Sequence, residues 1–478
     1  MYEQMGLFVT NLLFVFVLGW YLITNLQWYN YSLERVVLKH HKPLWHLMYF
    51  IIPFIAYYTT GKFFAIFFYF AILPGIFIWH KRLDKKVVLT WRVRRFLILL
   101  VGLSVFQNFL CTLQEGCAVY GVFLPLAVTY VGSFVIEKYL FMVYQKQAST
   151  KLESMKNLKI IAITGSYGKT SMKNFMTQIL SQKFKVYATP RSVNTIGGII
   201  RDVNESLNED VEIYICEAGA RERGDIYTIA QFLHPHLVVV GKVGPQHIEY
   251  FKTMENIIRT KLELMQSDRL EHAFVHNSVT DTPHEKVTFF GDGENVIANL
   301  EGTSFQLRLH EKQEQFETKV LGGFQTINMN ASILIADALG MSMQEIQKGV
   351  KALNSVEHRL ERIDAGGKII LDDGYNGNID GMLEGIRLCS LHEGRKVIVT
   401  PGLVESSPEL NQQLIHAIND LFDIAIITGS LNAEIFDTHL NVPKKIMLAD
   451  KATLTTVLGQ STQSGDIILF ANDAPNFI

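Results

Sequence analysis

Residues 164–171, TGSYGKTS, combine a glycine-rich turn with the lysine and threonine that open a helical pattern. A short apolar, β-rich run, residues 158–164, precedes the turn, and a segment with helical spacing, residues 171–182, follows it. Backbone N–H groups at the start of such a helix face an anion, and the helix dipole favours negative charge there. Lys169 is therefore predicted to bind the β- and γ-phosphates of a nucleotide, and the Thr170 hydroxyl to coordinate Mg²⁺.

The turn differs from the common phosphate loop, G-x-x-x-x-G-K-[ST], because Ile163 stands where the first glycine of that pattern is expected. A strand before the turn and a helix after it nevertheless make this more than a chance Gly-Lys-Thr. The sequence predicts a shorter nucleotide cradle made of Gly165, Ser166, Tyr167, Gly168, Lys169, Thr170 and Ser171.

This loop resembles the T-G-x-x-G-K-T-[ST] loop of the Mur ligase family, whose members are ATP-dependent, amide-forming ligases of peptidoglycan precursor synthesis. The resemblance extends through residues 158–380 and more faintly to the end of the chain, but it does not cover residues 1–145. It implies ATP and two Mg²⁺ ions as cofactors and a reaction that passes through an acyl phosphate.

Three further motifs follow the loop in the order that the family shows, and each implies a catalytic residue. The stretch ICEAGARERGDI implies that Glu217 binds Mg²⁺, VGPQHIEYF that His247 is a second metal ligand, and IIRTKLELM that Lys261 is the lysine carbamylated by CO₂ in this family. The implied catalytic set is Lys169, Glu217, His247 and Lys261, and the implied metal ligands are Thr170, Glu217 and His247.

The resemblance also implies residues for nucleotide and substrate binding. Asn328, Arg359 and Asp373 fall on family positions that contact adenine, phosphate and ribose, although Phe324-Gln325 replace the usual His-Asn. The implied substrate-binding residues are Asn194, Thr195, Tyr375, Asn376 and Asn378. The stretch LDDGYNGNID is most typical of members that add D-Ala-D-Ala, so the expected reaction joins this dipeptide to UDP-MurNAc-tripeptide.

Alternating strand and helix patterns position these residues. Strand-like runs that end in polar residues suit ligand binding at the carboxyl ends of a parallel sheet. We predict an N-terminal α-helical membrane region at residues 1–145, a central ATP-binding α/β domain at residues 146–362, and a Rossmann-like C-terminal α/β domain at residues 363–478.

Residues 1–145 contain five apolar stretches, each near the length of about 20 residues that spans a bilayer. Basic residues cluster in alternate connections, 27–42 and 80–95, and such loops stay in the cytoplasm. The chain is therefore expected to be a multi-pass protein of the bacterial plasma membrane, with its N-terminus outside and its catalytic domains cytoplasmic. The five stretches are 5–26, 43–60, 63–79, 96–113 and 117–136.

Composition limits the partners. A net charge of −2 gives no reason to expect nucleic acid, whereas the basic loops suit membrane lipid. Small-molecule substrates, a nucleotide-linked muropeptide and a dipeptide, are expected, as are membrane-bound cell-wall enzymes as partners. The four cysteines form no C-x-x-C pair and are expected to be free thiols.

Two alternatives stay open. One is a ligase of the same type for another substrate, such as poly-γ-glutamate. The other is an ATP-binding transporter or membrane scaffold, against which the near absence of charge within the apolar stretches argues.

Overall fold

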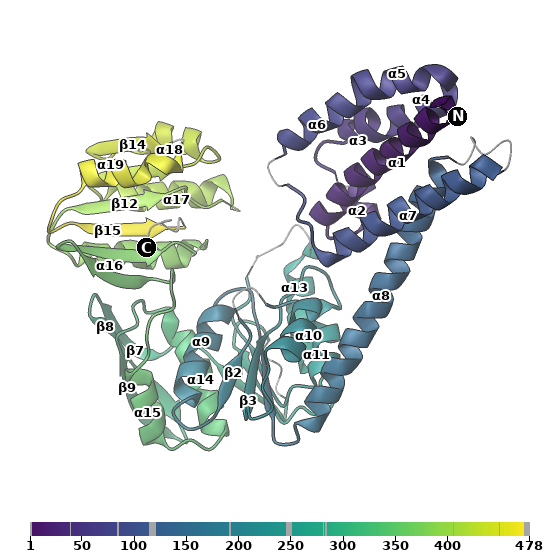
Figure 1. The fold of residues 1–478 in the computed structure, drawn as a ribbon. Helices are drawn as coiled ribbons and strands as arrows, with labels where there is room; N and C mark the ends of the chain where they lie inside the picture. Colours follow the sequence, from purple (N-terminus) through teal and green to yellow (C-terminus); the bar gives the residue numbers. More distant parts are fainter. Residues whose placement is uncertain are drawn as a thin grey trace. The chain divides into compact units, whose positions relative to one another are not determined.

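The computed structural model divides into two compact units, Met1–Gln145 and Lys146–Ile478, and each is described by itself (Figure 1). The residues described below are 2–38, 40–83, 86–113, 121–190, 193–244, 251–280, 282, 284–375, 377–404, 406–448 and 450–472.

The N-terminal unit is built of apolar helices. Among the residues that the structure describes, four helices are long and apolar enough to cross a membrane by length and composition, namely Phe8–Trp28, Phe64–Lys81, Trp91–Cys111 and Phe123–Ser154. The predicted second span corresponds to a shorter apolar helix, Leu44–Thr59, and the five membrane spans stay a prediction. The elements are α1 (Tyr2–Trp28), α2 (Leu33–Leu38), α3 (Leu44–His46), η1 (Leu47–Ile51), α4 (Ile52–Thr59), η2 (Gly61–Phe63), α5 (Phe64–Phe67), η3 (Phe68–Ile72), α6 (Leu73–Lys81), α7 (Trp91–Leu113) and α8 (Phe123–Ser154).

Contacts at one end of this unit join segments that are far apart in sequence. Gln27, near the end of α1, exchanges hydrogen bonds of 2.9 and 2.8 Å with the backbone of Val88, and the Arg92 guanidinium lies 3.6 Å from the centre of the Tyr31 ring. The end of α1 therefore lies beside the start of α7, and the two helices run in opposite directions. Cys111, near the other end of α7, is disulfide-bonded, which corrects the expectation that all four cysteines are free thiols.

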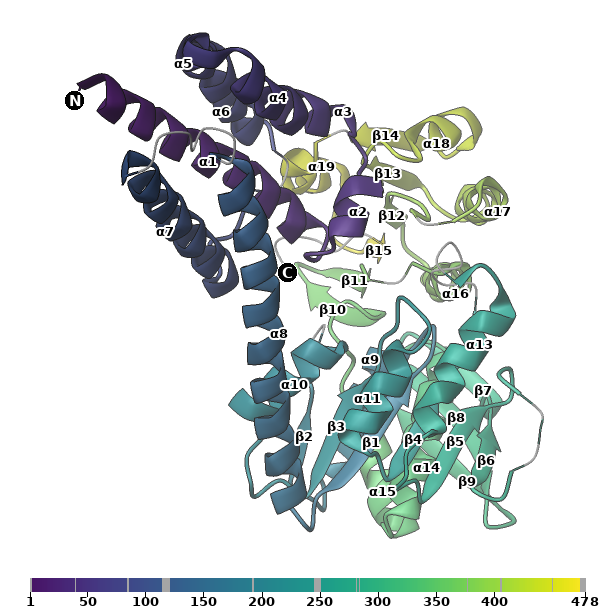
Figure 2. The same cartoon turned by 90° about the vertical axis from the view of Figure 1, so that its right-hand side faces the viewer.

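A six-stranded parallel sheet forms the centre of the second unit, with strand order β2-β3-β1-β4-β5-β6 (Figure 2). Because all strands are parallel, their carboxyl ends meet at one edge, where ligands bind in such sheets. The strands are β1 (Lys159–Thr164), β2 (Val186–Ala188), β3 (Ile213–Glu217), β4 (Leu237–Val240), β5 (His272–His276) and β6 (Val287–Phe290).

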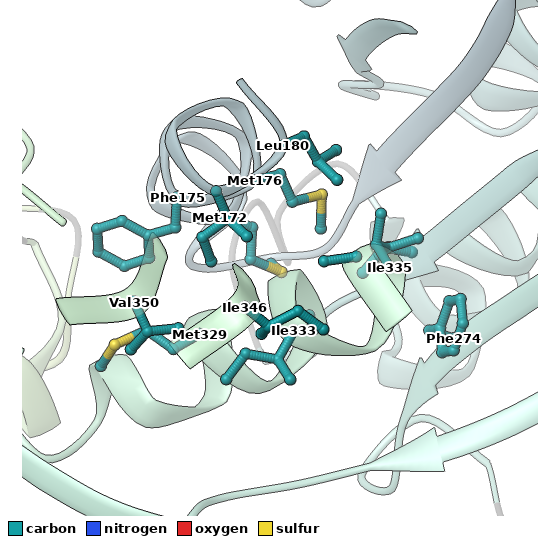
Figure 3. Packing of buried hydrophobic residues seen from close by; sticks show 14 of the residues in the cluster. Met172, Phe175, Met176, Leu180, Phe274, Met329, Ile333, Ile335, Ile346 and Val350 are labelled. Atoms are coloured by element: carbon teal, nitrogen blue, oxygen red, sulfur yellow. The ribbon is translucent and has the colours of Figure 1, made fainter. Parts of the chain in front are cut away.

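Alternate side chains of these strands point to opposite faces and bury two helical layers. On one face Ile161, Ile163 and Phe274 pack with α9 (Lys169–Leu180), α14 (Gln325–Ala338) and α15 (Met343–Lys351). Figure 3 shows Met172 and Phe175 of α9 directed toward Met329 and Ile333 of α14. The other face packs against α10 (Ile196–Glu205), α11 (Asp225–Leu233) and α13 (Met254–Leu262), which is followed by η5 (Glu263–Met265).

Two further sheets complete the unit. An antiparallel sheet, β7 (Glu294–Asn299), β8 (Gly302–Leu309) and β9 (Lys312–Thr318), precedes α14 and was not foreseen from the sequence. The last sheet has the order β10-β11-β15-β12-β13-β14, parallel except for β10. Its elements are β10 (Glu361–Ala365), β11 (Lys368–Asp373), α16 (Ile379–Ser390), β12 (Lys396–Thr400), α17 (Pro408–Asn419), β13 (Ile424–Thr428), α18 (Ala433–His439), β14 (Lys444–Leu448), η6 (Lys451–Thr453), α19 (Leu454–Ser461) and β15 (Ile467–Ala471).

Candidate active site

The predicted phosphate loop joins the end of β1 to the start of α9, at the carboxyl edge of the central sheet. Gly168 has a φ of 77°, which only glycine adopts without strain, and a Cβ there would lie 2.3 Å from Asn328 Oδ1. The Ser166 N–H donates to the Lys242 carbonyl at 3.0 Å. The loop is therefore held between α14 and the end of β4, and it requires glycine where it passes Asn328.

Lys169 opens α9, and its Nζ donates to the carbonyls of Gly165 and Ser166 at 2.7 and 3.2 Å. Burial lowers the pKa of Lys169 to about 8, with Glu217 opposing that shift and Arg359 adding to it. The electrostatic effect of Glu217 and Arg359 means that both charges lie near the loop. A cation buried in this way is better placed to bind a phosphate group than a cation in bulk solvent is.

Glu217 ends β3 with 4% of the residue exposed, and its Oε2 lies 3.5 Å from Thr170 Oγ1. Its Oε1 lies 2.8 Å from Lys173 Nζ and has no other partner among the residues described. Oxygen atoms of a carboxylate and a hydroxyl are ligands that Mg²⁺ prefers, together with water and substrate phosphates. Glu217 and Thr170 therefore fit a Mg²⁺ site that a bound nucleotide would complete.

Within the described ranges, no group of three or more His, Cys, Asp or Glu side chains is arranged to hold a metal by itself. His247 and Asn376 lie outside these ranges, so their predicted roles stay predictions. Of the predicted Mg²⁺ ligands, the described structure brings Thr170 and Glu217 together.

Lys261 lies near the end of α13 and is 5% exposed. Burial and the charge of Lys169 together lower the pKa of Lys261 to about 7, against the opposing effect of Glu263. A buried amine that is half neutral near pH 7 can react with CO₂, so the surroundings of Lys261 fit the carbamate that the sequence suggested.

The predicted substrate turn lies against the same sheet edge. The Gly219 N–H, two residues after Glu217, donates to the Asn194 carbonyl at 2.8 Å, and a Cβ at Gly219 would lie 2.9 Å from Asn194 Cγ. Thr195 is the N-cap residue of α10, with extended backbone angles and no side-chain capping bond. Asn194 and Thr195 thus lie near Glu217, at a position from which they would contact the reacting carboxylate of a substrate.

The segment between α15 and α16 carries the remaining predicted residues. Arg359 donates to the Tyr375 carbonyl, and Asp373, at the end of β11, is 1% exposed. Asn378 has a structural role, because its Oδ1 accepts the Gly381 N–H at 2.9 Å and so caps α16. Tyr375 is half exposed and could meet a ligand.

The sequence reading missed Lys173, whose ammonium group is buried beside Glu217. Its spacing was a usable signal: Lys169 and Lys173 are four residues apart on one helix and therefore share a face. A polar helix face at the start of α9 therefore indicates a functional role for Lys173 as well as for Lys169.

Comparison with known proteins finds similarity to Mur ligases. A family model described as "Mur ligase middle domain" matches residues 163–336. The UDP-N-acetylmuramoyl-tripeptide–D-alanyl-D-alanine ligase of Bacillus subtilis is 24% identical over 349 residues, covering 68% of this chain and 75% of that protein. The enzyme of the same name from Borreliella burgdorferi is 28% identical over 334 residues, covering 65% and 70%.

Solved structures share the fold. MurF from Acinetobacter baumannii superposes with a TM-score of 0.60 at 22% identity, covering 70% of this chain and 77% of that one. MurF from Thermotoga maritima, solved in complex with ADP, gives the same TM-score at 24% identity and covers 70% and 80%. Residues 163–336 therefore match a Mur ligase middle domain, and about 70% of the chain shares the fold of the solved MurF ligases.

Proposed function

We propose that this protein is a membrane-anchored, ATP-dependent ligase that joins D-Ala-D-Ala to UDP-MurNAc-tripeptide in peptidoglycan precursor synthesis. The observation that carries the proposal is the closeness of Thr170 and Glu217 beside the phosphate loop of a Mur ligase middle domain, where Lys169 contacts the loop carbonyls. The proposed substrates are those that appear in the names of the relatives from Bacillus subtilis and Borreliella burgdorferi.

The residues of the site suit the activation of a carboxylate. Carboxylates do not react with amines at neutral pH, so the γ-phosphoryl group of ATP is first transferred to the substrate carboxylate. Lys169 neutralises charge on the transferring group, and Thr170 and Glu217 would hold the Mg²⁺ that shields the same oxygens. The amine of the dipeptide then attacks the acyl phosphate, the C–N bond forms, and inorganic phosphate leaves.

Asn194 and Thr195 would orient the acceptor carboxylate near Glu217, and Arg359, Asn328 and Asp373 would contact the nucleotide. Carbamylation would convert Lys261 from a cation to an anion able to bind a second Mg²⁺. His247 would complete the metal ligands.

The N-terminal unit would anchor the enzyme in the plasma membrane. Its helices expose large apolar side chains, such as Ile98 at 70% and Phe134 at 56%, which suit lipid better than water. Exposed cations gather where α1 ends and α7 begins, and they would meet anionic headgroups on the cytoplasmic side. These cations are Lys42, Lys81, Arg82, Lys86 and Arg94.

The position of Cys111 supports the proposed orientation, which requires an odd number of membrane crossings. Cys111 lies 20 residues after Trp91 on α7, or about 30 Å at 1.5 Å per residue, which is the thickness of the hydrocarbon core. Disulfides persist in oxidising compartments, so the Cys111 end would be outside and the basic end inside. Because α1 is antiparallel to α7, the N-terminus would be outside, and α8 would lead back to cytoplasmic catalytic domains.

The direct test is ADP release by the purified full chain in detergent. Release should require UDP-MurNAc-tripeptide and D-Ala-D-Ala together, and the product should be the UDP-MurNAc-pentapeptide. ADP release that ignores this pair but responds to another amine and carboxylate, such as glutamate and a γ-glutamyl peptide, would favour a different ligase. No amide product with any pair would favour a transporter or scaffold.

A further inference from the structure

Lys173 is a buried cation for which the proposed reaction has so far given no role. It lies in α9, one turn after Lys169, and 5% of its side chain is exposed. Its Nζ donates to the Thr189 carbonyl at 2.6 Å, lies 3.4 Å from the Pro190 carbonyl, and lies 2.8 Å from Glu217 Oε1. The ammonium group thus has two carbonyl acceptors and one ion-pair partner.

These contacts tie together three segments that phosphoryl transfer must keep in register. Helix α9 carries the phosphate-binding Lys169, Glu217 ends β3, and Thr189 with Pro190 begins the turn that leads to Asn194. The Gly219 N–H holds the far side of that turn through the Asn194 carbonyl. The Lys173 ammonium is thus the point where the nucleotide loop, the carboxylate and the substrate turn meet.

We propose that Lys173 is a positioning residue for the metal–nucleotide complex. Its ion pair holds Glu217 by Oε1 alone, which leaves Oε2 directed at Thr170 Oγ1 across 3.5 Å. Without Lys173, the Glu217 side chain would lose its buried partner and be free to turn away from Thr170. The Thr189 and Pro190 carbonyls would lose their shared donor at the same time.

The expected size of the effect follows from this indirect role. Residues that orient a metal ligand typically change metal affinity by about 10- to 100-fold when they are removed. The inference rests on the proposed function, because it assumes that Glu217 binds the metal of a metal–nucleotide complex. Its test needs no ligase substrate, so the failure of one proposal is distinguishable from the failure of the other.

The experiment measures ADP binding to the full chain in detergent by calorimetry, with Mn²⁺ as the metal probe and without metal. Lys173→Met should weaken Mn²⁺–ADP binding at least tenfold and metal-free ADP binding less than threefold, and Lys173→Arg should recover part of the loss. The matched control is Lys185→Met, because Lys185 pairs with Asp210 at 3.2 Å on the surface, with 68% of its side chain exposed. This control should bind Mn²⁺–ADP as the parent protein does.

Removing one partner of a buried ion pair is strongly destabilising, so Lys173→Met could fail to fold. The double variant Lys173→Met/Glu217→Gln removes both charges and keeps the test informative. If Lys173 acts through Glu217, the double variant should bind Mn²⁺–ADP no more weakly than Glu217→Gln alone. A further tenfold loss in the double variant, or an equal loss of metal-free ADP binding in Lys173→Met, would overturn the proposal.

Discussion

Replacing Gly168 by alanine tests whether the phosphate loop is shaped by its contact with α14. The φ of 77° costs an L-residue about 1–2 kcal/mol, and the new Cβ would lie 2.3 Å from Asn328 Oδ1. Asn328 is 5% exposed and donates to Gln325 at 2.7 Å, so moving it would break a buried hydrogen bond worth about 1 kcal/mol. The free energy of unfolding should fall by about 2–3 kcal/mol in total, which lowers the melting temperature by roughly 3–4 °C for a cooperative unit of this size.

Thermal unfolding of the full chain, followed by fluorescence, measures this loss. Gly340→Ala is the matched control, because Gly340 also has a positive φ, 75°, but a Cβ there would meet nothing within 4 Å. This control isolates the backbone cost from the collision. Gly168→Ala/Asn328→Ala should be about 1 kcal/mol more stable than the sum of its single effects, because the colliding side chain is gone. Additive effects, or equal losses for Gly168→Ala and Gly340→Ala, would refute a loop shaped by Asn328.

Three further predictions use other parts of the chain. Lys261→Met should abolish ligation without lowering stability at pH 6–7, because the buried ammonium group is unfavourable there. The folded pKa of Lys261, about 7, lies below its usual 10.5, so the unfolded chain binds more protons between these two values and the stability contributed by this group rises with pH from about 7 to 10.5. Activity at limiting CO₂ should likewise rise between pH 6 and 8 as the amine becomes neutral, and be independent of CO₂ if no carbamate forms. Glu263→Gln should lower the melting temperature measurably, because its carboxylate accepts the backbone N–H groups of Gly224 and Tyr227 at the start of α11. In intact cells a membrane-impermeant maleimide should label Cys111 only after mild reduction, whereas buried Cys216 and Cys389 should stay unlabelled; labelling of Cys111 that requires membrane disruption would reverse the proposed orientation.

The local elements of the α/β domains were predictable because their signals are local. The apolar runs KIILDD, KVIVT, IAIIT and KKIML form β11, β12, β13 and β14, and the helix expected after the phosphate loop is α9 with its start shifted to Lys169. The antiparallel sheet from Glu294 to Thr318 escaped notice, since its polar, exposed β7 has little hydrophobic alternation. Prolines explain part of the difficulty in the membrane region: Pro53 and Pro74 follow stretches of widened helix, which hydropathy alone does not reveal.

The sequence by itself determined the chemistry on offer: a short glycine-rich loop with Lys169 and Thr170, acidic and basic motifs in a fixed order, and a long apolar lead. Spacing along the chain limits what neighbours can do, and hydrophobic periodicity fixes local structure. Only the tertiary structure decided which of these groups meet. The parallel register of β1, β3 and β4 brings the carboxyl ends of these strands to one edge, although the ends of β1 and β3 are more than fifty residues apart in the sequence. Lys173 is buried there against Glu217, and burial lowers the pKa of Lys261. Burial and pairing are properties of the folded packing, so no local pattern could have specified them.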